Sequence, residues 1–183
     1  MLDDADAEAA LIAAAQSDPR AFDDLYRRYV TRVYRYARAH AGSDEDAADL
    51  TQQTFLRALD ALPRYRAGAA PFGAWLCRIA RHTVVDAHRR RRAVPLVWEA
   101  LPEALHPLDS QEPEPAVLRA EALSQLAKLV SGLDAEKREL LALRFAARLS
   151  SPEIAAVVGK SPAAVKKQLT RILRALKEQY DEA

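Results

Sequence analysis

Residues 93–115 constrain the fold more than any other part of the chain, because they cannot form a long helix. Five of the ten prolines of this 183-residue chain fall here, with five acids and no lysine or arginine. These residues are Pro95, Pro102, Pro107, Pro113, Pro115, Glu99, Glu103, Asp109, Glu112 and Glu114. Proline lacks the N–H that a helix needs and clashes with the preceding turn. We therefore predict an interdomain linker that is solvated, folded back on a basic surface, or threaded through a basic channel of a partner.

The sequence on both sides of this segment is typical of helices. Half of the residues are hydrophobic, only five are glycine, and runs of β-branched residues are absent. Such a composition favours helices over strands. We predict an all-α protein with two helical domains, at residues 21–92 and 116–183, preceded by an acidic segment at residues 1–20.

Composition also limits the environment and the chemistry. No apolar run approaches the roughly 20 residues of a membrane span, and the acidic N-terminus is unlike a secretory signal. The only cysteine is Cys77, which excludes an intramolecular disulfide and a cysteine-rich zinc site. We expect a cytoplasmic protein without membrane insertion, metal or cofactor.

Two amphipathic helices are predicted in the first domain, after a short helix at residues 9–15. The first spans residues 21–41, where apolar residues recur every three or four positions and the tyrosines suit core packing. Ser43 caps the second helix, at residues 44–62, with acids in its first turn. One face of this helix is polar apart from a leucine, and periodicity alone assigns it no partner.

The stretch from Pro63 to Arg92 is strongly basic. It contains eight arginines and one acid, Asp86, so its formal charge is +7, while the whole chain has only +1. Aromatic residues lie between the arginines, and this combination can hold a polyanion and stack on its bases. The alternative is a solvated basic helix. In both readings a helix starts at Pro71. His82 and Asp86 are four residues apart on it, which predicts a surface hydrogen bond between them.

The last part of the chain has the sequence pattern of a helix-turn-helix. Ser150 and Glu153 have the spacing of a capping box, Gly159 permits a turn, and Ser161 precedes a proline at the start of the last helix. From Lys160 to Lys177 there are six basic residues and no acid. Lysines and arginines on such a helix neutralise DNA phosphates, and the alternative is a three-helix bundle with a basic surface. Together the two basic elements predict two contacts with one nucleic acid, one with a duplex groove and one with unpaired bases.

Three motifs in this order resemble the extracytoplasmic-function (ECF) branch of the bacterial sigma-70 family of RNA polymerase sigma factors. The first is similar to the helix that binds the polymerase clamp and comprises Asp49, Leu50, Gln52, Phe55 and Leu56. The second is similar to the helix beside the minus-ten element and comprises Trp75, Leu76, Ile79, Ala80, Arg81, Asp86, Arg89 and Arg90. The third is similar to the domain that reads the minus-thirty-five element and comprises Leu149, Ser150, Glu153, Ile154, Ala155, Gly159, Ser161, Val165 and Lys166.

The resemblance implies a sigma factor that directs promoter recognition, melting and initiation, with an anti-sigma factor as an expected partner. Core polymerase would be bound at its β′ clamp by Asp49, Gln52, Gln53 and Leu56, and at its β flap by the second domain. The implied minus-ten contacts are Arg64, Tyr65, Arg66, Arg78, Arg81, His82, Arg89 and Arg90. The implied minus-thirty-five contacts are Lys160, Ser161, Ala163, Ala164, Lys166, Lys167, Gln168 and Arg171.

Some residues depart from the family pattern. Ala48 and Gln53 stand where the family usually has glutamate, so the implied clamp contact is less acidic, and His82 replaces a common asparagine. The last helix has Ala164, Lys167 and Gln168 where threonine, serine and arginine are frequent. Gln168 has the side chain that pairs with adenine.

We predict no catalytic residue, because the four histidines are scattered and neither a phosphate loop nor a nucleophile motif is present. Two other classes of function fit the residues without the resemblance. One is a stand-alone helix-turn-helix regulator of duplex DNA, with residues 1–92 as a sensing or dimerising domain. The other is a protein-interaction module.

Overall fold

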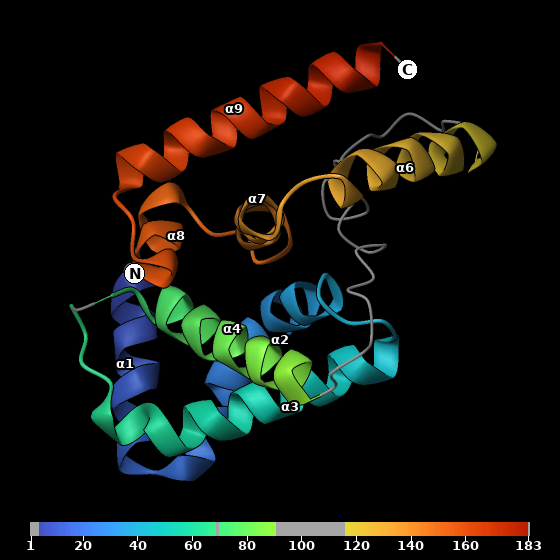
Figure 1. The fold of residues 1–183 in the computed structure, drawn as a ribbon. Coiled ribbons are helices and arrows are strands. Elements are labelled where there is room, and N and C mark those ends of the chain that lie inside the picture. Colours follow the sequence, from blue (N-terminus) through green and yellow to red (C-terminus); the bar gives the residue numbers. More distant parts are fainter. Residues whose placement is uncertain (1–3, 69, 91–115, 183) are drawn as a thin grey trace.

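The computed structural model describes residues 4–68, 70–90 and 116–182, so the predicted linker at residues 93–115 lies outside the described residues. Every regular element in these ranges is helical, which confirms the all-α prediction (Figure 1). Within the same ranges, none of the helices has the length and hydropathy needed to cross a membrane.

Four α-helices and two short 3₁₀ turns form the first domain. They are α1 (Asp4–Ser17), η1 (Pro19–Ala21), α2 (Phe22–Arg38), α3 (Asp44–Ala61), η2 (Leu62–Arg64) and α4 (Phe72–Arg90). Ser43 caps α3 by accepting a hydrogen bond from the Asp46 backbone at 3.1 Å. Asp18 caps η1 through the Arg20 backbone at 2.9 Å. Local capping therefore sets these boundaries, and the cap at Ser43 is the one predicted from the sequence.

Helix α1 is longer than the predicted helix at residues 9–15 and packs against α2. It buries Ile12 and Ala15 in the core of the domain. The Gln16 amide donates hydrogen bonds to the backbone carbonyls of Leu62 and Tyr65, at 3.0 and 2.9 Å. The N-terminal segment thus helps to hold the chain where it leaves α3.

An aromatic cluster joins α2, the loop after η2 and α4. The Phe72 ring is 1% exposed and lies 5.3 Å from Tyr29, 5.4 Å from Tyr65 and 5.2 Å from Trp75, between ring centroids. Such tilted and edge-to-face arrangements are the favoured geometries of aromatic pairs. The cluster fixes the start of the basic helix α4 against the core.

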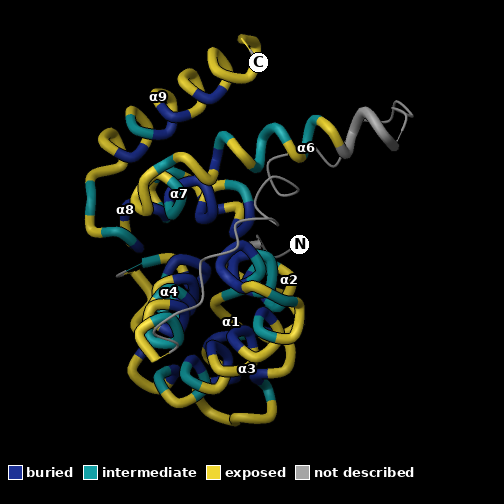
Figure 2. The backbone as a smooth tube through the Cα atoms, turned by 45° about the vertical axis from the view of Figure 1, so that its right-hand side comes forward, coloured by how far each residue is buried: buried dark blue, intermediate teal, exposed yellow. Residues whose placement is uncertain are grey.

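The second domain consists of α6 (Ala116–Ser131), α7 (Ala135–Leu141), the π-helical turn η3 (Ala142–Ala146), α8 (Ser151–Val158) and α9 (Pro162–Asp181). The predicted capping box is present. The Ser150 side chain accepts a hydrogen bond from the Glu153 backbone N–H, and the Glu153 side chain accepts one from the Ser150 backbone N–H. Gly159 follows α8 with a φ of 73°, a left-handed conformation that favours glycine. Figure 2 shows buried and exposed residues alternating along α9, whose buried residues are Val165, Leu169, Ile172 and Leu176.

The two domains lie directly against each other. Helix α8 packs along α4, and η3 packs against α2 (Figure 1). Gly73 on α4 lies at this junction, where an added Cβ would stand 2.7 Å from the Arg32 guanidinium and 3.7 Å from the Glu153 carboxylate. The helices therefore approach closely at a residue that lacks a side chain.

Replacing Phe72 with alanine is expected to lower the free energy of unfolding by about 3–5 kcal/mol, because it leaves a cavity under the aromatic cluster. Val85→Ala is the matched control, since Val85 lies on the same helix and is 36% exposed. That control is expected to change stability by no more than about 0.5 kcal/mol. Urea unfolding followed by circular dichroism measures both, and equal losses would contradict the role assigned to Phe72.

Candidate nucleic-acid interface

Helix α3 presents a polar row beside an apolar groove. Asp49, Gln52 and Gln53 are exposed, and Leu56 is 57% exposed although it is a large apolar residue. Next to Leu56, a groove of about 670 Å³ runs between α2 and α3. An apolar side chain exposed at a groove is typical of a surface that binds another protein.

Tyr26 belongs to this surface, although its spacing predicted a place in the core. It lines the groove with 40% of its surface exposed, and its ring lies 4.7 Å from that of Phe55. Tyr26 lies at the edge of the apolar stripe of α2, where periodicity alone does not separate a core residue from a groove residue. The groove needs α3 opposite it, which only the tertiary structure supplies.

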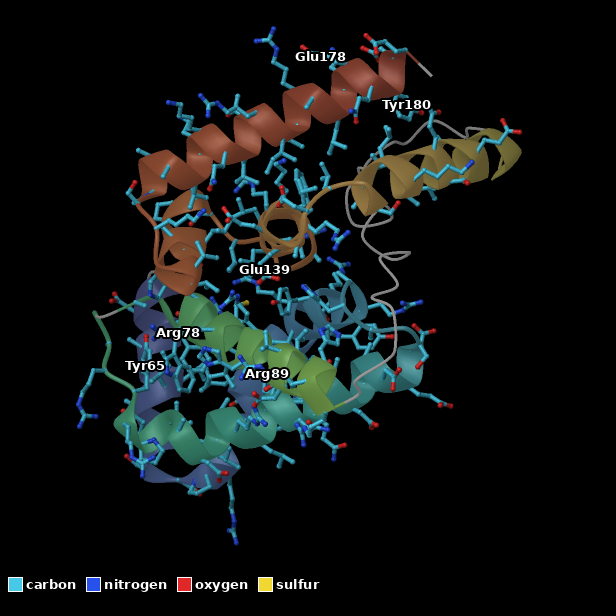
Figure 3. The ribbon with its side chains drawn as sticks, viewed as in Figure 1. Tyr65, Arg78, Arg89, Glu139, Glu178 and Tyr180 are labelled. Atoms are coloured by element: carbon cyan, nitrogen blue, oxygen red, sulfur yellow. The ribbon has the colours of Figure 1, made fainter. Side chains whose placement is uncertain are left out.

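Helix α4 carries its cations on the side away from the core. Arg78, His82, Arg89 and Arg90 are exposed, and Figure 3 shows Arg78 and Arg89 toward opposite ends of the helix. Arg81 differs from them, because its Nε lies 3.3 Å from Oε1 of Glu139 in the second domain. Three of the predicted arginines of this helix and His82 are therefore open to solvent, and one arginine faces an acid.

The basic loop before α4 is partly as predicted. Arg64 and Arg66 are exposed, and the Arg66 guanidinium donates to the backbone carbonyls of Pro63 and Tyr65 at 3.2 Å each. Tyr65, which the resemblance placed among the minus-ten contacts, is only 7% exposed. Its hydroxyl donates to the Ala70 carbonyl at 2.9 Å, so Tyr65 supports the loop from below.

Asp86, for which a hydrogen bond with His82 was predicted, is paired with a residue of another helix. Asp86 accepts a hydrogen bond from the Arg57 guanidinium of α3 at 2.9 Å. This hydrogen bond, with the charges of nearby arginines, lowers the pKa of Asp86 below its ordinary value. The one acid of the basic stretch therefore joins α3 to α4, which a pattern within α4 alone could not indicate.

Helix α9 exposes Ala163, Ala164, Lys166, Lys167 and Arg171. Ser161 accepts a hydrogen bond from the Ala164 backbone at 3.2 Å and so caps the helix.

Two predicted contact residues near the start of α9 are bonded within the protein. Lys160 pairs with Glu136 on α7, and the Gln168 amide donates to the same Glu136 oxygen at 3.1 Å. The Lys160 ammonium also donates to the Gln168 carbonyl oxygen at 3.1 Å. These hydrogen bonds, from Lys160 first and Gln168 second, lower the pKa of Glu136.

The described residues contain no group of three or more histidine, cysteine, aspartate or glutamate side chains that could hold a metal ion. Cys77 is fully buried, and burial raises its pKa to about 12. Its thiol is therefore kept protonated and unreactive.

A helical domain with a basic helix, followed by a helix-turn-helix domain with a second basic helix, defines the class of two-domain transcription initiation factors. The family model for sigma-70 region 2 matches residues 25–94, and that for sigma-70 region 4 matches residues 123–176. The ECF RNA polymerase sigma factor SigD of Mycobacterium tuberculosis is 36% identical over 179 residues, which cover 94% of this chain and 82% of SigD.

Solved structures have the same fold. CnrH in complex with the cytosolic domain of CnrY has a TM-score of 0.68 and 29% identity, covering 94% of this chain and 96% of that one. The sigma factor RpoE in complex with the anti-sigma factor NepR from Bartonella quintana has a TM-score of 0.64 and 21% identity, covering 87% and 96%.

The chain belongs to the sigma-70 family and to its ECF branch. It binds RNA polymerase and directs initiation at promoters, so the alternative of a stand-alone regulator is excluded.

Two substitutions of Ser161 test its role as the cap of α9. Ser161→Ala is expected to lower the free energy of unfolding by about 1 kcal/mol, whereas Ser161→Asn keeps an acceptor at the cap and most of the stability. Denaturant unfolding measures both variants. Equal stability of Ser161→Ala and wild type would contradict the capping role.

Proposed function

We propose that the first domain docks on the β′ clamp of core RNA polymerase through Asp49, Gln52, Gln53 and Leu56. The exposure of Leu56 beside the apolar groove supports this best, because an apolar anchor next to polar groups is typical of a protein interface. Tyr26 extends the same surface across the groove.

Leu56→Asp is expected to weaken core binding at least tenfold, which is about 1.4 kcal/mol, because it places a charge in the apolar contact. Gln52→Ala is expected to weaken it less. Tyr180→Asp is the matched control, since Tyr180 is 37% exposed at the far end of α9 (Figure 3).

Affinity for fluorescent core polymerase and promoter-specific transcription in vitro measure these variants together. Leu56→Asp should lose both, while Tyr180→Asp keeps both. Unchanged core affinity of Leu56→Asp would refute the proposed clamp surface, and absence of promoter-specific transcripts with wild type would refute the proposed activity.

We further propose that the basic side of the first domain holds the melted minus-ten element. The residues assigned to it are Arg64, Arg66, Arg78, Arg81, His82, Arg89 and Arg90. The arginines at the end of α4 suit backbone phosphates, and the exposed loop arginines can stack on unpaired bases. Tyr65 has a supporting place under this loop and no contact with DNA.

The second domain, in the same proposal, places α9 in the major groove of the minus-thirty-five element. Lys160, Lys166, Lys167 and Arg171 neutralise phosphates. Gln168 has the donor and acceptor that adenine requires, and the methyl groups of Ala163 and Ala164 suit contact with thymine. Ser161 acts through the helix cap.

Two substitutions distinguish phosphate contact from base readout. With the holoenzyme, Lys167→Ala should weaken binding to all sequences. It should also reduce the slope of log affinity against log salt concentration by about one unit. Gln168→Ala should keep the slope and lose about 1–3 kcal/mol of discrimination at one base pair. Lys177→Ala, near the other end of α9, is the control. Salt titrations on a set of promoter variants measure all three, and loss of slope without loss of discrimination in Gln168→Ala would overturn its assignment.

We propose the remaining assignments with the support of family membership. The chain works in the cytoplasm, touches the β flap through its second domain, has no catalytic activity of its own, and is regulated by an anti-sigma factor that covers the clamp surface. CnrH, which resembles it over most of its length, has been solved with a bound cytosolic partner domain.

A further inference from the structure

Glu139 on α7 contacts polar side chains from three places in the first domain, through two hydrogen bonds and one ion pair. The Tyr36 hydroxyl donates to its Oε1 at 2.8 Å, and His40 Nε2 lies 2.9 Å from its Oε2. The Arg81 Nε lies 3.3 Å from Oε1. Figure 3 shows Glu139 between α7 and the helices of the first domain. One side chain of the second domain is thus bonded to α2, to the residues after it and to α4.

These contacts are buried, which makes them sensitive to the loss of a partner. The exposed fraction of the side chain is 16% for Glu139 and 4% for His40, and Tyr36 is fully buried. Burial alone would raise the pKa of Glu139, but the hydrogen bonds from His40 and Tyr36 and the charge of Arg81 bring it below its ordinary value. Removing one member of a buried charged network leaves the others without compensation.

The neighbouring acid on α7 faces the other DNA-binding element. Glu136 lies one turn before Glu139 and binds Lys160 and Gln168. A cavity of about 430 Å³ between the domains is lined by both acids and by Arg81 and Lys160. Two carboxylates of one short helix therefore hold side chains assigned to both promoter elements.

This packed arrangement cannot span a promoter. The two elements lie about 25 base pairs apart, which is roughly 85 Å at ~3.4 Å per base pair, whereas the two domains here are in direct contact. The chain between Arg90 and Ala116 can cover a similar distance, since an extended chain spans at most about 3.3–3.6 Å per residue. Covalent connection thus permits separation, and the contacts at α7 oppose it.

We propose that Glu139 is a latch that holds the two domains in a closed form, and that polymerase and promoter binding must break it. Closure itself is independent of the proposed function, but its effect on DNA binding rests on the assignment of Arg81. In the closed form Glu139 takes the place of a phosphate at Arg81, whereas the contacts of Glu136 with Lys160 and Gln168 lie within the second domain.

Glu139→Lys tests the latch, because a cation there repels Arg81 and removes the carboxylate that accepts from Tyr36. The control is Glu182→Lys, which makes the same change of charge at an exposed residue beyond α9. Small-angle scattering of the full chain should give an increased radius of gyration for Glu139→Lys, above the roughly 16 Å of a compact chain of this length. The control should match wild type. Binding of the free chain to promoter DNA should tighten roughly tenfold, the factor by which a 90% closed population lowers apparent affinity.

An unchanged radius of gyration in Glu139→Lys would overturn the proposal. If circular dichroism shows that Glu139→Lys loses helix, Glu139→Gln is measured in its place, because glutamine keeps the shape of the side chain and removes its charge. An unchanged radius of gyration in Glu139→Gln would then overturn the proposal. Expansion without tighter DNA binding would support the latch and refute the assignment of the DNA-binding residues. An equal gain in DNA affinity for Glu182→Lys would overturn the effect on DNA, because added charge would then explain it.

Discussion

Closely spaced arginines repel one another, and the first domain must hold them in place against this repulsion. The stretch from Pro63 to Arg92 has a formal charge of +7. Its helix α4 stays in place because the apolar side of that helix is fixed to the core. Phe72, Leu76 and Ala80 are each 1% exposed. The contact of Tyr65 with Ala70 and the contact of Gln16 with the loop backbone hold the basic loop to the same core. The positions of the exposed arginines are thus determined by core residues of α4 and by the contacts of Tyr65 and Gln16 with the loop.

Local patterns were enough to predict much of the fold. The caps at Ser43, Ser150 and Ser161 and the apolar side of α9 are as the sequence indicated. Each of these features depends on residues within a few positions of one another, or on one face of one helix. The family was predicted from short motifs in a fixed order, and it is confirmed by the models for regions 2 and 4, which match residues 25–94 and 123–176.

Features that depend on distant parts of the chain could not be predicted. Tyr65 is buried because Phe72 and Trp75 close over it, and Asp86 turns to Arg57 on another helix. The partners Tyr36 and Glu139 are 103 residues apart. The role of each candidate DNA-binding residue stays a prediction, because exposure permits a contact with DNA without identifying the base or phosphate.

The distribution of acids gives this arrangement an energetic consequence. Moving Arg81 from Glu139 to a phosphate exchanges one anion for another, so the gain in free energy is smaller than for an arginine that starts in water. Lys160 makes the same kind of exchange when it leaves Glu136, but both of these residues lie in the second domain, so that contact does not depend on closure. Isolated promoter DNA therefore gains little from Arg81 until other contacts separate the domains. RNA polymerase supplies such contacts if its clamp and flap bind one domain each, as proposed above. On this argument, the closed form makes promoter binding depend on polymerase through the same side chain, Arg81, that would contact DNA.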